Sequence, residues 1–125
     1  MKIVLDTSII IDKLRGGRVW ETLISDVDLS SEVYIPTVVI FELFSGQSTR
    51  KTEVVKKINQ FLKPFPKLDF DAKIAQRAGQ IFRDLPTKID VPDYIVAASA
   101  LEIGAYVATA NIKHFSQIPG LLLLH

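Results

Sequence analysis

The sequence predicts an α/β domain in which a parallel β-sheet is covered by helices on both faces. Short apolar runs alternate with helical patterns along the chain, an order typical of parallel sheets. The 125 residues suit one domain, 1–125, without internal repeats or linkers. A hydrophobic fraction of 48% beside 23% charged residues is that of a globular chain.

The first half of the chain begins with a strand and then becomes mostly helical. The apolar run KIVL forms the strand, and Gly16-Gly17 closes the helix after it. Thr37 is expected to cap the helix VVIFELFS, which Gly46 ends. From the spacing of apolar residues we expect, in order, a strand over 2–5, helices over 8–15 and 18–27, a strand over 32–36, and helices over 38–45 and 49–63.

The second half alternates strands and helices more regularly. Asp71 is expected to cap a helix that carries one apolar stripe. The last helix, DYIVAASALEI, is apolar on nearly every side and should therefore be buried. The expected elements are a short strand after the turn in KPFPKLDF, a helix over 72–85, a loop over 86–92, a helix over 93–103, and strands over 105–110 and 120–125.

Composition excludes several classes of protein. The chain has no cysteine, which rules out a disulfide scaffold, a thiolate zinc site and a cysteine nucleophile. Its formal net charge of +1 gives no overall basic field that would indicate a nucleic-acid binder. Asp6 interrupts the apolar start, unlike in a signal peptide, and no apolar run is long enough to span a bilayer. We expect a cytoplasmic protein that does not associate with membranes.

Two carboxylates occupy unusual places in apolar segments. Asp6 ends the first strand, and in open parallel sheets ligands bind beyond the carboxyl ends of the strands. It could equally cap the next helix, although Thr7 and Ser8 are available for that role. Glu42 is the only charged residue in IPTVVIFELFSG, so it either reaches solvent or needs a partner, an arginine or a bound cation.

A third carboxylate begins the most apolar helix of the chain. Asp93 follows Asp90 and Pro92 in DVPDYIVAASALEIG, so it could simply interact with the helix N-terminus while Asp90 caps it. The same N-terminus would keep Asp93 ionised, as a metal ligand must be. Small residues along this helix allow a close approach to the sheet, which would bring the acid near the end of the first strand.

If Asp6, Glu42 and Asp93 converge, they need a cation. Two carboxylates about 4 Å apart repel by about 4 kcal/mol at an effective dielectric constant of 20. Three such pairs would cost about 12 kcal/mol, as much as the stability of a whole domain. Oxygen ligands without cysteine or paired histidines favour Mg²⁺ or Mn²⁺ over Zn²⁺. Such an ion activates water and bridges phosphate oxygens, so the expected chemistry is phosphodiester hydrolysis.

The motifs VLDTS, FELFSG, DYIVAASAL and VATANIKHF, followed by IPGLLLL, occur in this order along the chain. Together they resemble PIN-domain ribonucleases, and among these the VapC-type toxins of toxin–antitoxin pairs, over residues 1–124. The resemblance implies a three-layer α/β/α sandwich with a central parallel sheet, the PIN-like fold. It also implies a Mg²⁺- or Mn²⁺-dependent endoribonuclease that cleaves RNA, forms a homodimer and is inhibited by a cognate antitoxin. The antitoxin would occupy an apolar groove near Glu42, to which Phe41 and Phe44 are expected to contribute.

Carried over position by position, the family's three invariant acids fall on Asp6, Glu42 and Asp93, which are expected to be catalytic and to bind the metal. The fourth acidic position of the family falls on Asn111, also an expected catalytic residue, which departs from the pattern because it adds no charge. The alternative for Asn111 is a turn residue after a strand. Supporting roles, as hydrogen-bond partners of the acids or of metal-bound water, are expected for Thr7, Ser8 and Thr109.

An RNA substrate would also need contacts to its phosphates, although basic residues on helices more often lie on a solvated face. Contacts to RNA are expected among the basic residues Arg15, Arg18, Arg50, Lys51 and Lys113. His114 is interpreted as a structural or solvated histidine rather than a general acid.

Two other functions remain open from the sequence. A non-catalytic module of the same fold would bind RNA or an antitoxin without cleaving RNA. A Mg²⁺-dependent phosphoacceptor signalling domain has a similar length and sheet, but it would need paired acids after the first strand. Here Asp6 follows Leu5, which is not an acid.

Overall fold

A computed structural model describes residues 1–124 of the chain. Within these residues five strands form one parallel sheet in the order β3-β2-β1-β4-β5. The central strand β1 pairs with β2 on one side and with β4 on the other. The strands are β1 (Lys2–Leu5), β2 (Glu32–Pro36), β3 (Lys67–Leu68), β4 (Tyr106–Ala108) and β5 (Leu122–Leu124).

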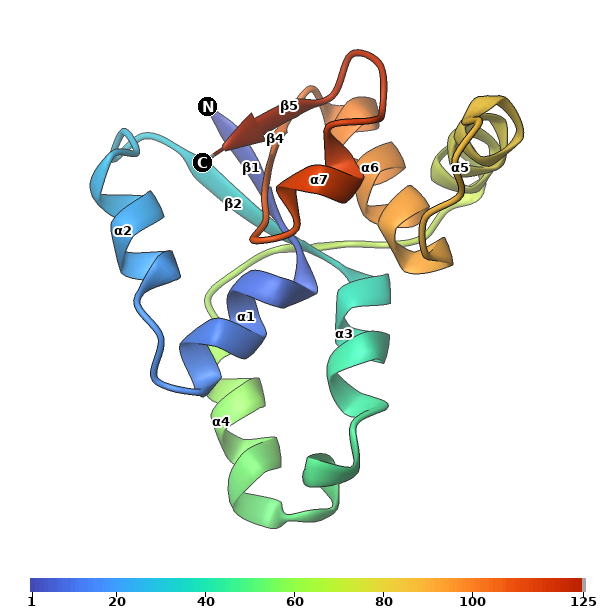
Figure 1. The fold of residues 1–125 in the computed structure, drawn as a ribbon. Helices are drawn as coiled ribbons and strands as arrows, with labels where there is room; N and C mark the ends of the chain where they lie inside the picture. Colours follow the sequence, from blue (N-terminus) through green and yellow to red (C-terminus); the bar gives the residue numbers. More distant parts are fainter. Residues whose placement is uncertain (125) are drawn as a thin grey trace.

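Helices cover the sheet on both sides, which confirms the three-layer α/β/α sandwich. Figure 1 shows the strands between α2 on one side and α5 with α6 on the other, while α1, α3 and α4 lie towards the carboxyl ends of β1 and β2. The helices are α1 (Thr7–Leu14), α2 (Val19–Ser25), α3 (Thr37–Phe44), α4 (Thr52–Leu62), α5 (Ala72–Asp84), α6 (Val91–Ile103) and α7 (Ile112–Phe115), with a 3₁₀ helix η1 (Gln47–Arg50).

The core forms where β1 and α6 meet the other elements. Ile3, Val4 and Leu5 of β1 are at most 2% exposed, because neighbouring strands and helices enclose them on every side. All residues from Asp93 to Ala100 in α6 are buried, as its apolar pattern predicts. Gly104 ends α6 in the left-handed conformation (φ 67°), which glycine adopts without steric cost.

The prediction for the basic segment in the middle of the chain needs correction. The helix expected over 49–63 is divided at Lys51, whose extended backbone (φ −89°, ψ 129°) separates η1 from α4.

The cap predicted at Thr37 also needs correction. Thr37 is the first residue of α3 and does not cap it. Its Oγ1 accepts a hydrogen bond from the Phe70 backbone N–H at 3.3 Å. This contact ties the start of α3 to the segment after β3.

Other differences concern the ends of elements. The helix over 93–103 begins earlier, at Val91, because Pro92 fits the first helical turn, where its missing N–H has no partner to lose. The cap predicted at Asp71 is confirmed, since its Oδ1 accepts from the Ile74 N–H at 2.9 Å. His125, the last residue of the expected final strand, lies outside the described residues.

Over the part that is described, no helix combines the length and apolarity needed to cross a membrane.

Candidate active site

Asp6 lies beyond the carboxyl end of β1, next to the end of β4. Its backbone N–H donates to the Ala108 carbonyl at 3.0 Å, so the two strand ends stay together past the last paired residues. Asp6 is 4% exposed as a residue, and its Oδ2 accepts from Ser8 Oγ at 2.7 Å and from Thr109 Oγ1 at 2.8 Å. Within residues 1–124 its side chain caps no helix, so the capping alternative is not what the structure shows.

The two hydroxyls that bind Asp6 are themselves fixed by the backbone after β4. The Ala110 N–H donates to Ser8 Oγ at 3.0 Å, and the Asn111 N–H donates to Thr109 Oγ1 at 2.8 Å. Each hydroxyl therefore accepts one hydrogen bond and donates its own proton to Asp6. This arrangement satisfies a buried carboxylate without supplying a positive charge.

Glu42 reaches the same region from α3. Thr7 Oγ1, in the first turn of α1, donates to Glu42 Oε1 at 2.7 Å. Burial raises the pKa of the Glu42 carboxyl above its usual value, and the charges of Asp6 and Asp93 raise it further, while the Thr7 hydrogen bond opposes them. The influence of both aspartates on Glu42 means that the three carboxylates share one electrostatic environment.

Asp93 lies in the first turn of α6 and faces α7. Its Oδ2 is 3.1 Å from His114 Nδ1, and its side chain is 11% exposed. Burial raises the pKa of the Asp93 carboxyl and the charge of Asp6 adds to this, whereas the His114 contact lowers it. In the described part of the chain, the backbone N–H of Asp93 bonds to the Asp90 carbonyl and no side chain caps α6.

We call Asp6, Glu42 and Asp93 together the acid site. Among the described residues, none of the three forms a salt bridge with a lysine or arginine, so the structural-arginine alternative for Glu42 is not found. Residues 1–124 also contain no group of three His, Cys, Asp or Glu side chains spaced to hold a metal ion. The acids thus share one region, held by hydroxyls and one imidazole, without forming a closed coordination shell.

The structure places Asn111 at the start of α7 and beside His114. Asn111 occupies the N-cap position of this short helix, and its Nδ2 is 3.1 Å from His114 Nδ1. The sequence analysis interpreted His114 as structural or solvated, because a lone histidine in a loop more often has that role, and the contact of His114 with Asp93 was not expected. A possible signal in the sequence was its position, three residues after Asn111 and directly before the apolar residue Phe115.

The predicted basic residues have different surroundings. Arg15 lines a cavity of about 450 Å³ together with Ser8 and Ala110, next to the acid site. Arg15 also borders a groove on the side of Glu42. Arg50 instead bonds to Gln47 at 2.7 Å within η1. The described contacts of the other three predicted RNA-binding residues do not reach the acid site; these are Arg18, Lys51 and Lys113.

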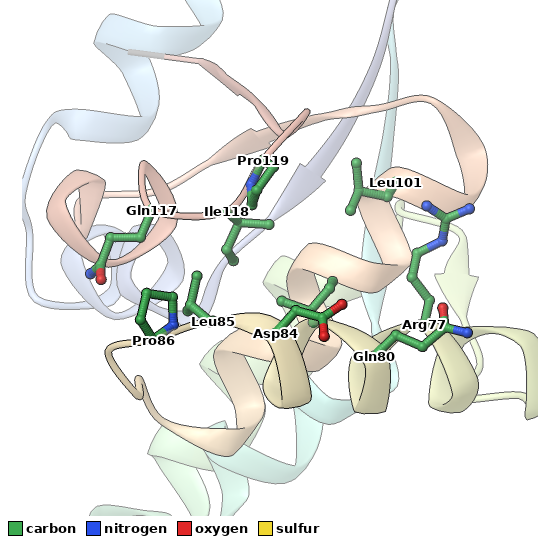
Figure 2. Close-up of a pocket in the computed structure, with 10 residues that line it drawn as sticks. Arg77, Gln80, Asp84, Leu85, Pro86, Leu101, Gln117, Ile118 and Pro119 are labelled. Atoms are coloured by element: carbon green, nitrogen blue, oxygen red, sulfur yellow. The ribbon is translucent and has the colours of Figure 1, made fainter.

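A further cavity of about 320 Å³ lies between α5, α6 and the segment before β5 (Figure 2). Its floor is apolar, with Leu85, Leu101 and Ile118 among its lining residues. The carboxylate on its edge, Asp84, is paired with Arg83 at 2.7 Å. Because none of the acid-site residues lines this cavity, it is separate from the candidate active site.

The parallel α/β/α sandwich, with three acids brought to one region near the carboxyl end of β1, is the arrangement expected of a PIN-like domain. The PIN domain family model matches residues 3–121, and the chain belongs to this family. Ribonuclease VapC3 of Methanocaldococcus jannaschii is 32% identical over 101 residues, which cover 78% of this chain and 97% of that protein. Ribonuclease VapC19 of Mycobacterium tuberculosis is 28% identical over 119 residues, 94% of this chain and 95% of the relative.

Solved structures show the same fold in protein complexes. The crystal structure of VapBC2 from Rickettsia felis, bound to a DNA fragment from its promoter, contains a chain that matches with a TM-score of 0.87. The two chains are 26% identical, and the match covers 98% of this chain and 97% of the other. The likeness to VapC-type proteins inferred from the motifs is thereby confirmed.

Proposed function

We propose that this chain is a metal-dependent endoribonuclease that hydrolyses RNA phosphodiester bonds as the toxin of a toxin–antitoxin pair. Its curated relatives carry the name ribonuclease over nearly the full length of the chain. The observation that carries the mechanism is the acid site, where Asp6 and Asp93 are buried and none of the three carboxylates pairs with a lysine or arginine among residues 1–124. RNA as the substrate makes the cytoplasm the proposed place of action.

The donor chemistry of the acid site fits Mg²⁺, with Mn²⁺ as an alternative. Three carboxylates supply hard oxygen ligands. The raised pKa values of Glu42 and Asp93 mean that their negative charges are disfavoured where they lie, and a bound cation would stabilise these charges. Asp6, Glu42 and Asp93 would hold the ion, whose bound form lowers the pKa of water and neutralises charge on the phosphate.

The chain's own residues prepare the acids for this role. Thr7 holds one oxygen of Glu42, which leaves the other oxygen free. Ser8 and Thr109 both hold Oδ2 of Asp6, so Oδ1 remains for a ligand. Asn111 follows β4 at the family's fourth acidic position, where its amide adds polarity without charge. We assign these residues to holding the carboxylates in place, and phosphate contacts to Arg15 first among the basic side chains.

A groove of about 360 Å³ supports an antitoxin partner. It lies between α1, α3 and α4 and is lined by apolar side chains, with Arg15 and Glu42 also in contact with it. The apolar residues are Ile11, Leu14, Leu43, Val54 and Ile58. Phe41 and Phe44, expected in this groove, do not line it, because Leu43 is the buried residue of this turn while Phe41 is 71% exposed. An apolar segment ending in a basic residue would suit this groove and reach Glu42.

Homodimerisation is also part of the proposal. Phe41 on α3 and Val91 at the start of α6 are 71% and 62% exposed, and the two helices pack against each other. A second copy would cover such apolar surface. Light scattering should then report twice the monomer mass of 14.0 kDa. A monomer at micromolar concentration would exclude this part of the proposal.

The deciding experiment combines cleavage with binding. Purified protein is incubated with total RNA in Mg²⁺, in Mn²⁺ and in EDTA, and its melting temperature is measured under the same conditions. We expect fragments with internal cleavage sites only when metal is present. An ion at 100 times its Kd should also stabilise the fold by about 2.7 kcal/mol. RNA binding without cleavage would favour the non-catalytic module, and a stable acyl-phosphate after incubation with a phosphodonor would favour the signalling domain.

A further inference from the structure

His114 contacts the acid site, and the mechanism above gives it no role. Its Nδ1 is 3.1 Å from Asp93 Oδ2 and 3.1 Å from Asn111 Nδ2. The side chain is 37% exposed, so part of the ring reaches solvent while Nδ1 contacts the buried carboxylate. His114 therefore lies at the boundary between solvent and the acid site.

The fold fixes the position of His114 through both ends of α7. Phe115, the next residue, is fully buried and anchors the helix in the core. At the other end, the Asn111 N–H donates to Thr109 Oγ1, the same hydroxyl that donates to Asp6. The imidazole is thus held by a segment that also fixes another acid of the site.

The two neighbours of His114 Nδ1 require opposite hydrogen-bond roles of it, donor to one and acceptor from the other. Asp93 Oδ2 accepts a hydrogen bond when ionised, whereas Asn111 Nδ2 donates one. A ring nitrogen either carries a proton or accepts one, so it serves one neighbour at a time. A carboxylate that binds a metal is ionised, and it requires a donor on its other oxygen when buried. The Nδ1–H form of His114 meets this requirement.

We propose that His114 is a positioning residue for Asp93. Through Nδ1–H it would hold Oδ2 of Asp93, so that Oδ1 would be available to the ion. This inference rests on the proposed function. Where the family pattern has a fourth negative charge, this chain combines a neutral Asn111 with a histidine that orients an existing acid. Outer contacts of this kind change metal affinity or activity by about 10- to 100-fold.

The test measures Mn²⁺ affinity by electron paramagnetic resonance, together with the melting temperature. His114→Ala should weaken Mn²⁺ binding by about 10- to 100-fold while the chain stays folded. His114→Asn should largely restore the affinity, because its amide nitrogen takes nearly the place of Nδ1. His114→Gln places its amide nitrogen farther out, near Nε2, and should not restore it. Ser116→Ala, an exposed change in the same segment whose hydroxyl bonds to the Lys113 carbonyl, should bind Mn²⁺ like the wild type.

The outcomes separate this inference from the proposed function. If the wild type binds Mn²⁺ and cleaves RNA but His114→Ala has unchanged affinity, the positioning role is excluded and the function stands. A wild type that neither binds Mn²⁺ nor cleaves RNA overturns both. If His114→Ala fails to fold, the Asn and Gln variants decide, since equal affinities in the two would exclude a role that depends on the place of the donor.

Discussion

Carboxylates of the acid site and carboxylates on the outer surface of α5 and α6 have different hydrogen-bond partners. On the outer surface, Asp84 bonds to Arg83 at 2.7 Å and Glu102 to Arg77 at 3.0 Å. The carboxylates of the acid site instead bond to hydroxyls and to one imidazole. Both arrangements give the carboxylates hydrogen-bond donors, but only the arginines on the outer surface bring a permanent positive charge.

The pKa directions express the same contrast. The hydrogen bond from Arg83 lowers the pKa of Asp84, whereas burial raises the pKa values of Glu42 and Asp93. A fold that pairs acids with arginines at its surface has left three acids without a lysine or arginine partner, among residues 1–124, near the carboxyl end of its sheet. The difference points to a positive charge that comes from outside the chain, as a bound ion.

The largest effect should come from removing one acid-site charge. Asp93→Asn keeps the shape of the side chain but removes a ligand charge, so RNA cleavage should fall by more than about 100-fold, beyond the loss typical of outer contacts. Circular dichroism should show a folded chain. Asp84→Asn is the matched control, because it removes a carboxylate that already has its own cation and should cleave RNA like the wild type. Equal activity of both variants would contradict the proposed mechanism.

The fold was largely predictable because its signals are local. KIVL and DYIVAASALEI are apolar enough to identify the buried central strand and the buried helix, and both are confirmed. The break at Lys51 was not predictable, because an extended residue between two helical turns leaves the apolar spacing intact. Thr37 was assigned as a cap from its residue type, but a distant backbone group, Phe70 N–H, takes its hydroxyl.

The acid site was predictable in its residues but not in its partners. Each acid stood out against an apolar segment, and the order of motifs matched a family. Which hydroxyl serves which carboxylate depends on contacts between residues as far apart as Ser8 and Thr109, which no local pattern encodes. The contact between His114 and Asp93 joins two residues 21 positions apart on different helices, so the local pattern around His114 did not indicate which acid it would contact.

A smaller effect should appear in stability. Glu42→Gln removes one repelling charge and still accepts the Thr7 hydrogen bond, so in metal-free buffer at pH 7 the melting temperature should rise. Because Glu42 is partly solvated, we expect about 3 °C, less than about 1 kcal/mol at this chain length. With metal present the variant should lose the stabilisation that the ion gives the wild type. A clear loss of stability without metal would indicate a structural ion pair instead.

The pH dependence gives the same variant a second readout. The folded chain binds the protons of Glu42 and Asp93 more tightly than the unfolded chain, since both pKa values are raised. The contribution of these two groups to stability without metal should therefore increase as the pH falls from 7, and it should level off below the usual glutamate and aspartate values of 4.5 and 3.8. Glu42→Gln should show a smaller increase than the wild type. Parallel curves would show that Glu42 keeps its usual pKa.

The smallest effect belongs to the surface pair. Arg83 and Asp84 have side chains 68% and 66% exposed, so solvent screens their attraction, and ordering the two side chains offsets much of what remains. Arg83→Gln should leave the melting temperature unchanged within error, with and without Mg²⁺. The variant serves as a comparison for Glu42→Gln, which removes one charge of the opposite sign at the acid site. If Glu42→Gln kept the same stabilisation by Mg²⁺ as Arg83→Gln, the ion would not act through Glu42 at the acid site.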